Sequence, residues 1–595
     1  MHPHPLAPRR GLLALLLACT LAAACADAPP PSSPDYAALK RRFEREIPLA
    51  LTQAGVKGLS VALVDGDKVV WSQGFGMADA EAGLQATPQT VYPLGSVAKV
   101  FTASAVMQLV EARRAQLDQP IEEVIPAFSM QARFSSGPIT LRNLLTHHAG
   151  IPEQVGGGFS PRPLTLTERV EALREEHRAW PVGTLHAYSN TGFVIAGRAV
   201  ETASGSDFDT FMQQHLFGPL RMEHSAFRVT PAISERLAKG YGALPPENVP
   251  PYWLESEGPA GGLRGSVEDV SHFVLMLLDG GRFDGQQVLQ PESLQELWRE
   301  QNAGHPLDVG TRIGLAWYLH DVPLKGGGSV RMVEHDGGAL YFNAIVALVP
   351  EHRLGVVVMS NTDSAGGLVN GLAREVLARA LKVKTGQVVA QPSSPTAQPE
   401  PRPPEALASW AGLYSTDAGP MHMEVRGENL VATVGDLVLE LVPHQQGLFR
   451  AQVGDAPLWL TFQQSGSHTL LIGYSETQGE GLFGTRIAPS PMPESWRARL
   501  GAYRISPGHP RELIDEVVLS EAGGMLLLSY RGPLYDGAVT AVLDPAGADL
   551  AAVAGLGRGR GEVLRATDGA DGASLTFKGV RLHRPLGKRD AAQTP

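Results

Sequence analysis

The sequence predicts an α+β domain followed by an all-β module that is barrel-like. Three observations predict this order. Helical and strand patterns are mixed over the first two thirds of the chain, a proline-rich stretch follows, and short alternating segments with few helical windows fill the last third. Mixed patterns are typical of α+β domains, and alternation alone is typical of sheets. Because 595 residues exceed what one hydrophobic core usually organises, at least two domains are expected.

The first domain is assigned to residues 36–385. Apolar alternation around Asp65-Gly66-Asp67 predicts a β-hairpin, because strands with one buried face alternate apolar and polar residues. Periodicity and composition place the remaining elements. The predicted hairpin strands are residues 59–64 and 69–75, the helices are residues 97–114, 166–176 and 368–381, and two further strands are residues 341–348 and 354–359.

A proline-rich linker, residues 386–404, separates the first domain from the all-β module, residues 405–590. Proline cannot hold a helix or a β-ladder, so we expect a semi-rigid spacer. In the module, residues 421–425 and 430–434 alternate around a Gly-Glu-Asn turn and predict a hairpin. Two similar openings indicate an internal repeat. They read Trp410-Ala411-Gly412-Leu413-Tyr414 and Leu500-Gly501-Ala502-Tyr503.

Composition excludes some classes of function. Hydrophobic residues make up 43% of the chain and charged residues 19%, which is ordinary for a folded protein. Fifty basic residues against sixty-one acidic ones give a net charge of -11, so the charge balance does not favour phosphate backbones as partners. No nucleic-acid partner is expected.

The amino terminus predicts an export signal over residues 1–26. Arg9 and Arg10 precede an apolar run that is too short to span a bilayer, and small residues follow it. Both cysteines, Cys19 and Cys25, lie in this signal, so the mature chain offers no thiolate for catalysis or metal binding. A Pro/Ser tether, residues 27–35, connects the signal to the first domain.

Two ways of processing this signal remain open. Residues 21–25, Leu-Ala-Ala-Ala-Cys, resemble a bacterial lipoprotein site, in which Cys25 becomes the lipidated first residue, and Cys19 is a second candidate. The alternative is plain cleavage after Ala26. Either route predicts an exported protein, which is periplasmic or anchored to the membrane as a bacterial lipoprotein.

The strongest chemical signal is Gly95-Ser96-Val97-Ala98-Lys99, where an extended segment gives way to a helical run. Residues three apart on a helix share a face, so the hydroxyl of Ser96 and the amine of Lys99 can form a hydrogen bond. A base beside a nucleophile is what nucleophilic catalysis requires. Burial at the positive end of a helix would favour the neutral, proton-accepting form of Lys99. Such a motif also recurs by chance in long chains, so its context decides.

Two further elements supply that context: Tyr188-Ser189-Asn190, and His335-Asp336-Gly337-Gly338 before a predicted strand. In this order and spacing the chain resembles the class C β-lactamase group of serine hydrolases, which includes D,D-carboxypeptidases, D-aminopeptidases and esterases. The resemblance implies a β-lactamase/penicillin-binding-protein-like domain, with an antiparallel sheet flanked by helices and a helical subdomain. Four more blocks carry it: residues 144–152, 259–266, 314–317 and 356–361.

The resemblance also implies roles for the matching residues. Ser96 would attack a carbonyl carbon and form an acyl-enzyme, while Lys99 and Tyr188 share the proton transfer in a division that the sequence leaves open. Asn190 would hold the lysine and the substrate amide. The backbone N–H groups of Ser96 and Gly338 would stabilise the tetrahedral oxyanion.

The third element departs from the Lys-Thr-Gly of most β-lactamases. His335 stands where a permanent cation usually anchors a carboxylate, which argues against efficient β-lactam turnover and would make carboxylate recognition depend on pH. Gly337 and Gly338 keep the small residues of the pattern and are assigned, with His335, to substrate and oxyanion binding. Tyr341 stands where relatives usually have glycine, so we expect it to reshape the acyl-side pocket.

Several other residues favour structural roles. His147 and His148 have no third ligand at metal-binding spacing, so hydrogen bonding is expected and no metal is proposed. Asp118 is typical of a turn or helix cap. Gly261-Gly262 favours a loop beside the active site over a phosphate cradle, because no Gly-Lys-Ser/Thr follows.

The predicted function is an envelope serine hydrolase that acts on small esters, D-amino-acid peptides or cell-wall peptides without a cofactor. Its expected partner is a small-molecule or peptide substrate. Two alternatives stay open: a β-lactamase with genuine β-lactam turnover, and a non-catalytic envelope ligand-binding protein with the same fold. Three roles are compatible with the all-β module: limiting access to the active site, pairing protomers, or binding envelope glycans. The oligomeric state is left open.

Overall fold

The computed structural model describes most of the chain. Its described ranges are residues 34–155, 164–243, 258–390, 395–454, 456–475, 479–488, 490–505, 516–531, 538–569 and 572–584. The predicted export signal, with Cys19 and Cys25, lies outside the described residues, as does most of the predicted tether. The lipidation of Cys25 therefore stays a prediction.

A seven-stranded antiparallel sheet forms the centre of the first domain. The predicted hairpin is confirmed, with Asp65 paired to Lys68 at its turn, and the two later strands are confirmed as neighbours. Across the sheet the order is β3 (Leu84–Gln85), β2 (Lys68–Asp79), β1 (Gly58–Asp65), β11 (Leu354–Ser360), β10 (Phe342–Val349), β9 (Ser329–Ala339) and β8 (Tyr318–Pro323).

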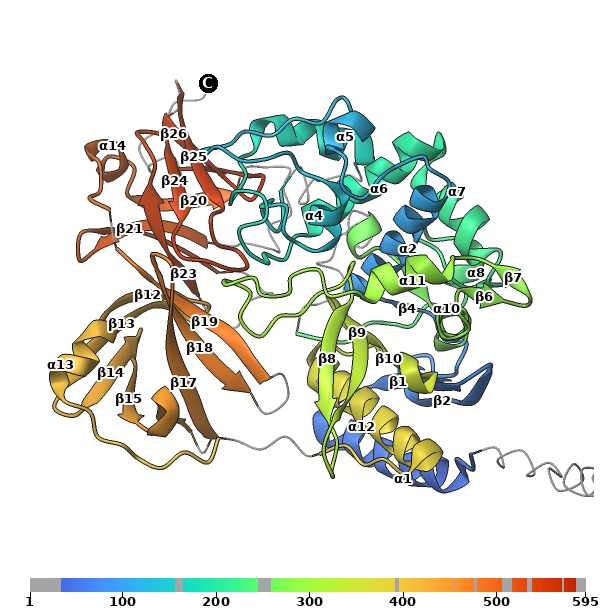
Figure 1. Ribbon diagram of the computed structural model, residues 1–595. Coiled ribbons are helices and arrows are strands. Elements are labelled where there is room, and N and C mark those ends of the chain that lie inside the picture. The colour runs from blue at the N-terminus through green and yellow to red at the C-terminus, as the bar shows by residue number, and fades with distance from the viewer. Residues whose placement is uncertain are drawn as a thin grey trace, which may run out of the picture.

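Helices cover both faces of this sheet. Helices α1 (Ala37–Ala54) and α12 (Gly366–Thr385) lie side by side on one face (Figure 1). Successive residues of a strand point to opposite faces. Val61 and Leu63 of β1 therefore pack with α1 and α12, whereas Ala62 belongs to the core on the other face. The continuous burial of β1 follows from this double cover.

The other face carries the helical part of the domain, and two of its helices were predicted from the sequence. The helix predicted over residues 97–114 is α2, and the one predicted over 166–176 is α5 followed by a 3-10 turn, Leu173–Glu175. The helices are α2 (Ala98–Glu111), α3 (Ile121–Val124), α4 (Leu141–Leu145), α5 (Leu166–Ala172), α6 (Asn190–Ser204), α7 (Phe208–Met212), α8 (Pro231–Ser234), α10 (Val267–Leu278) and α11 (Pro291–Trp298). Two short ladders join them: β4 (Tyr92–Pro93) with β5 (Arg264–Gly265), and β6 (Arg282–Phe283) with β7 (Gln286–Gln287).

The first domain ends with α12 at Thr385. Gly386 adopts a left-handed φ of 76° and its N–H caps the carbonyl of Lys382, a conformation that glycine tolerates best. In the proline-rich segment that follows, the described residues make isolated bridges, Val389 with Leu324 and Pro399 with His444. Longer ladders would need the N–H groups that proline lacks.

The predicted all-β, barrel-like architecture is confirmed, and it consists of two closed barrels. Short helices, α13 (Pro404–Leu407) and α14 (Glu494–Arg497), precede them. The first barrel contains β12 (Gly412–Thr416), β13 (Gly419–Arg426), β14 (Asn429–Val434), β15 (Leu437–Pro443), β16 (Leu448–Val453), β17 (Ala456–Ser465), β18 (His468–Ser475) and β19 (Gly479–Ile487). The second contains β20 (Gly501–Ile505), β21 (Glu516–Ala522), β22 (Met525–Arg531), β23 (Val539–Pro545), β24 (Leu550–Val553), β25 (Val563–Gly569), β26 (Gly572–Phe577) and β27 (Val580–His583).

The internal repeat seen in the sequence lies where the first strand of each barrel begins. In the first, the Tyr414 hydroxyl donates to the carbonyl of Trp410 over 2.8 Å. In the second, the Tyr503 hydroxyl donates to the carbonyl of Arg499 over 2.7 Å. Both tyrosines are buried on the first strand of a barrel, so the shared glycine-x-tyrosine pattern ties that strand to the segment just before it.

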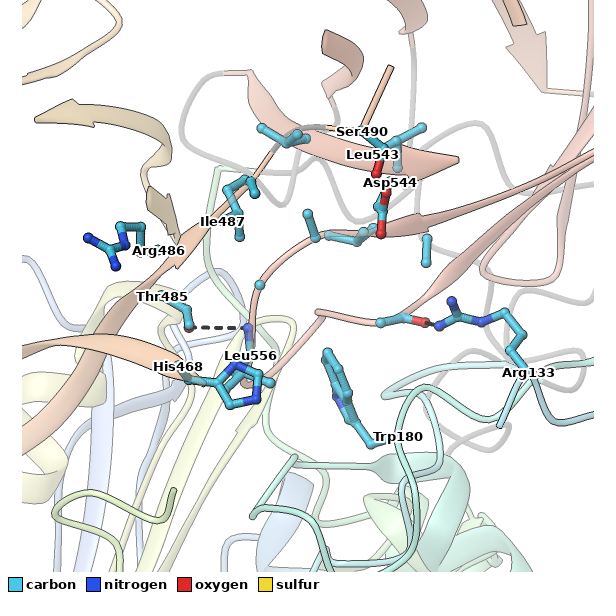
Figure 2. Close-up of a pocket in the computed structure, with 17 residues that line it drawn as sticks. Arg133, Trp180, His468, Thr485, Arg486, Ile487, Ser490, Leu543, Asp544 and Leu556 are labelled. Atoms are coloured by element: carbon cyan, nitrogen blue, oxygen red, sulfur yellow. Dashed lines mark hydrogen bonds between the residues drawn. The ribbon is translucent and has the colours of Figure 1, made fainter. Parts of the chain in front are cut away.

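The two barrels lie along one side of the first domain (Figure 1). Figure 2 shows the hollow where the three parts meet, lined by Arg133 and Trp180 of the first domain, Thr485 of the first barrel and Asp544 of the second. Among the described residues, no helix combines the length and apolar character needed to cross a membrane.

Candidate active site

Ser96 lies on a tight turn between strand β4 and helix α2. The chain passes from β4 through a 3-10 turn, Gly95–Val97, before α2 begins. Gly95 has a φ of 54°, and a Cβ at this position would lie 2.6 Å from the carbonyl oxygen of Gly338. Only glycine fits such a turn without strain. Ser96 is partly exposed between buried neighbours, so it is the residue of this turn that a substrate can reach.

Lys99 is fully buried one helical turn after Ser96, as the motif predicts. Its Nζ lies 3.1 Å from Ser96 Oγ, 2.7 Å from Asn190 Oδ1 and 2.6 Å from the carbonyl oxygen of Ala260. As an ammonium it can donate to all three oxygens. As a neutral amine it can donate to the amide and the carbonyl and accept from Ser96. The geometry therefore supports proton transfer between Ser96 and Lys99 in either direction.

Tyr188 reaches the same hydroxyl from the segment that precedes α6. Its OH lies 2.7 Å from Ser96 Oγ, which favours a role in proton transfer over that of a core tyrosine. Burial raises the pKa of Tyr188 well above its ordinary value, and Tyr318 adds to this increase. The hydrogen bond to Ser96 and the positive charge of Arg558 act in the opposite direction. Tyr188 is therefore a phenol whose ionisation depends on nearby cations.

His147 supports the tyrosine, as expected for a structural histidine. Its ring stacks on the Tyr188 ring at 4.3 Å, and its Nδ1 accepts the backbone N–H of Ser189 over 3.0 Å. Burial lowers the pKa of His147 far below its ordinary value, and the neighbouring His186 and Lys99 lower it further. A neutral imidazole with an accepting Nδ1 fits this contact.

Asn190 connects the lysine to a loop of the first domain. It is the first residue of α6, and Ser189 caps that helix by accepting the N–H of Gly192. While Asn190 Oδ1 accepts from Lys99, its Nδ2 donates to Gln154 Oε1 over 3.2 Å. These contacts on both sides of the amide fix its orientation, so its oxygen faces the lysine.

The third predicted element forms the end of β9, against the Ser96 turn. A Cβ on Gly337 would lie 2.0 Å from the carbonyl oxygen of Leu94 and 2.8 Å from the backbone nitrogen of Ser96. A Cβ on Gly338 would meet no atom within 4 Å. Gly337 on the strand and Gly95 on the turn therefore allow the close approach that places the backbone of Gly338 beside the Ser96 turn.

His335 is buried beside the site, not exposed to solvent. It is 1% exposed, and its Nδ1 lies 2.6 Å from the carbonyl oxygen of Asp336. Burial, with a smaller contribution from the charge of Lys99, lowers the pKa of His335 to about 4. The sequence suggested a pH-dependent carboxylate anchor here, but a histidine with this pKa is neutral throughout the physiological range. The third element therefore supplies no cation.

The remaining candidates have structural partners. His148 Nε2 lies 2.7 Å from Asp308 Oδ2, and Asp118 pairs with Arg142 across 2.7 Å. Within the described ranges, no group of three or more His, Cys, Asp or Glu side chains is arranged to hold a metal ion. Tyr341 is 7% exposed and packs against a neighbouring loop, where a Cβ on Gly240 would lie 2.5 Å from its ring.

The sequence did not single out three contacts of this site. Two are the Ala260 carbonyl at Lys99 and the Gln154 amide at Asn190. The third is Arg558 of the second barrel, whose guanidinium lies 4.8 Å from the centre of the Tyr188 ring and pairs with Glu153. Ala260 belongs to the block of residues 259–266 that carried the family resemblance, but no local pattern marks Arg558.

An active-site serine on the first turn of a helix, with a lysine three residues on and a tyrosine from a second element, defines the penicillin-recognising class of serine hydrolase folds. The family model Beta-lactamase matches residues 42–381. The chain belongs to this family, as its three motifs indicated.

Named relatives are spread over bacteria and fungi. The chain is 31% identical over 399 residues to penicillin-binding protein 4 of Amycolatopsis lactamdurans, a match that covers 65% of this chain and 99% of that protein. It is 28% identical over 341 residues to an unguisins hydrolase of Aspergillus campestris, covering 54% and 62% respectively. A solved structure of SurE, 23% identical, superposes with a TM-score of 0.56 and covers 75% of this chain and 98% of that one.

Proposed function

We propose that this protein is a serine acyl hydrolase that acts through an acyl-enzyme on Ser96, with small esters, D-amino-acid peptides or cell-wall peptides as substrates. One observation carries the proposal: Ser96 Oγ lies 3.1 Å from Lys99 Nζ and 2.7 Å from the Tyr188 hydroxyl. A nucleophile within hydrogen-bonding reach of two proton-transfer groups is the arrangement that acyl transfer needs. No cofactor takes part in the proposed reaction.

The reaction proceeds as two acyl transfers, first from the substrate to Ser96 and then from Ser96 to water. Ser96 Oγ bonds to the carbonyl carbon while its proton passes to the Lys99–Tyr188 pair, and the N–H groups of Ser96 and Gly338 bind the oxyanion. The pair then returns the proton to the leaving oxygen or nitrogen as its bond to carbon breaks. Water repeats the sequence on the acyl-enzyme, and the proton it loses ends on Ser96.

The substrate range follows from the missing cation of the third element. A buried, neutral His335 offers no permanent charge to the carboxylate of a penicillin or cephalosporin. We therefore expect measurable hydrolysis of short-chain activated esters and weak cephalosporin turnover. A cephalosporinase efficiency near the diffusion limit would contradict this ranking.

The relatives support hydrolase chemistry in general. One is named a penicillin-binding protein and another an unguisins hydrolase, so penicillin binding and hydrolysis both occur among proteins similar to this chain. These names do not select one substrate, and panels of esters, D-peptides and β-lactams would do so.

A covalent probe tests the proposal directly. A fluorescent fluorophosphonate should label the wild type and leave Ser96→Ala unlabelled. Ser104→Ala is the matched control, because Ser104 lies further along the same segment, buried on α2, where it donates to the carbonyl of Val100. Ser104→Ala should label like the wild type. Folded wild-type protein that reacts with neither this probe nor a fluorescent penicillin would instead favour the non-catalytic ligand-binding protein.

We also propose that the protein is exported and anchored through a lipid on Cys25. The apolar run that ends in Leu-Ala-Ala-Ala-Cys supports this proposal. In a bacterial host, labelled palmitate should be incorporated into the wild type and not into Cys25→Ser. Incorporation that survives Cys25→Ser and disappears in Cys19→Ser would assign the lipid to Cys19.

A further inference from the structure

The loop between β24 and β25 of the second barrel reaches the active site of the first domain. It runs from residue 554 to residue 562 and carries glycines at positions 555, 557, 559 and 561, all with positive φ. Two of these glycines are needed for close packing. A Cβ on Gly555 would lie 2.7 Å from the Ser415 side chain, and a Cβ on Gly561 would lie 2.7 Å from the carbonyl oxygen of Ala179. The loop is therefore fitted between the first barrel and the first domain.

Hydrogen bonds hold the loop at both ends (Figure 2). The Leu556 N–H donates to Thr485 Oγ1 over 3.2 Å, and Arg133 donates to the carbonyl of Gly561 over 3.3 Å. The Leu556 side chain is buried with Leu185, only three residues before Tyr188. A loop fixed in this way can hold a side chain at a defined place beside the tyrosine.

Arg558 is the side chain that this loop places at the active site. Its guanidinium carbon lies 4.8 Å from the centre of the Tyr188 ring, within the range of a cation–π interaction. Its Nε donates to Glu153 Oε1 over 2.9 Å. Burial works against the charged carboxylate, but Arg558 holds the pKa of Glu153 below its ordinary value. Both partners of this pair are therefore charged at neutral pH.

Glu153 joins the arginine to the rest of the catalytic group. Its backbone carbonyl accepts the N–H of Asn190 over 3.0 Å, and the next residue, Gln154, accepts from the Asn190 side chain. The second barrel thus contacts the catalytic group at two points, through the face of Tyr188 and through the loop that orients Asn190.

The charges around the phenol explain why this arginine matters. On the cationic side, Lys99 lies 4.8 Å from the ring centre, whereas the neighbouring Tyr318 and the carboxylate of Asp336 oppose ionisation of the phenol. The stacked His147 is neutral, and so is His335 at physiological pH. With no cation on the third element, Arg558 supplies a permanent second positive charge at Tyr188.

We propose that Arg558 is a positioning residue for the acylation step: its guanidinium, held over the Tyr188 ring by the second barrel, stabilises the phenolate that takes the proton of Ser96. The proton lost by Tyr188 moves to Lys99, which becomes an ammonium with the oxygens of Asn190 and Ala260 as acceptors. As Ser96 Oγ bonds to the carbonyl carbon, its proton passes to the phenolate. This inference rests on the proposed acyl hydrolase and deepens it.

The test is the pH profile of kcat/KM for a short-chain activated ester. Arg558→Gln removes the positive charge, so the apparent pKa of the Lys99–Tyr188 pair should rise by about one unit or more, as the interaction of unit charges about 5 Å apart near a protein surface requires. The rate should fall about tenfold or more on the acidic side of the profile and recover at alkaline pH. Arg558→Lys should restore most of the wild-type profile. Arg560→Gln, in the same loop but paired with the exposed Asp417, is the matched control and should leave the profile unchanged.

A second measurement does not depend on turnover. Ultraviolet difference titration of wild type against Tyr188→Phe reports the phenolate directly, and the same difference in the Arg558→Gln background should move to higher pH. An unmoved profile and titration would overturn the role of Arg558. So would an effect confined to KM, which would assign the arginine to substrate binding. Both results leave the hydrolase intact if the covalent probe still labels Ser96, whereas loss of labelling in the wild type would reject the hydrolase itself.

Discussion

Gly337→Ala tests how closely β9 must approach the nucleophile. A Cβ on Gly337 would lie 2.0 Å from the Leu94 carbonyl oxygen, and real Cβ contacts are essentially never under 3.0 Å. Strand and turn must therefore separate by at least about 1 Å. The antiparallel ladder to β10 resists this movement. Displacing reacting groups by about 1 Å can cost about a hundredfold in rate, so we expect kcat/KM to fall by about that factor or more.

The assay is acylation by an activated ester, with chemical unfolding measured in parallel. Gly371→Ala is the control, because a Cβ at this exposed position of α12 meets nothing within 4 Å. It should keep the wild-type rate and increase the free energy of unfolding by up to about 1 kcal/mol. A folded Gly337→Ala enzyme with the wild-type rate would refute the argument. It would show that the Gly338 N–H can bind the oxyanion without close contact between its strand and the Ser96 turn.

Three further predictions concern protons. Lys99→Ala should lower kcat by about two orders of magnitude or more while the protein still folds, as single-turnover acylation and circular dichroism can show. His335→Gln should leave the shape of the pH–rate profile unchanged between about pH 6 and 9, because the pKa of His335 is about 4; a lost ionisation in that range would contradict its burial. Burial also lowers the pKa of His186 to about 4, from 6.5 when exposed. Between pH 6.5 and pH 4 the unfolded chain therefore binds a proton at His186 that the folded chain does not. The free energy of unfolding is unaffected by His186 above pH 6.5 and decreases as the pH falls toward 4, by up to about 1.4 kcal/mol per histidine and pH unit. Urea unfolding across that range should show the decline, and an unchanged midpoint would disprove it.

The sequence predicted the parts of the site that depend on local spacing. Ser96 and Lys99 lie three residues apart on a helix, so their contact follows from helical geometry once the helix is recognised. Tyr188 and Asn190 depended on the family resemblance, because their approach to Lys99 is set by the packing of α6 against α2. The burial of His335 could not be deduced, since its exposure is decided by side chains that are distant in the sequence.

The fold shows the same division between local and distant information. Hairpins and helices were predicted because their periodicity is local. The division of the β-region into two barrels was not, because each closure depends on pairing between first and last strands, β12 with β19 and β20 with β27. The glycine-x-tyrosine repeat at Tyr414 and Tyr503 was the one sequence signal of two similar units, because it lies where the first strand of each barrel begins.

Both barrels contact the first domain close to Tyr188, which indicates a function for them. Leu185 and Ala187, just before Tyr188, are buried by Leu470 and Ile472 of β18 and by Leu556 of the second barrel. Without both barrels, the segment that leads to the tyrosine would expose its apolar side chains to water and lose its support. Because these contacts pack against the segment just before Tyr188 and Arg558 lies over the Tyr188 ring, the two barrels support the catalytic group of their own chain.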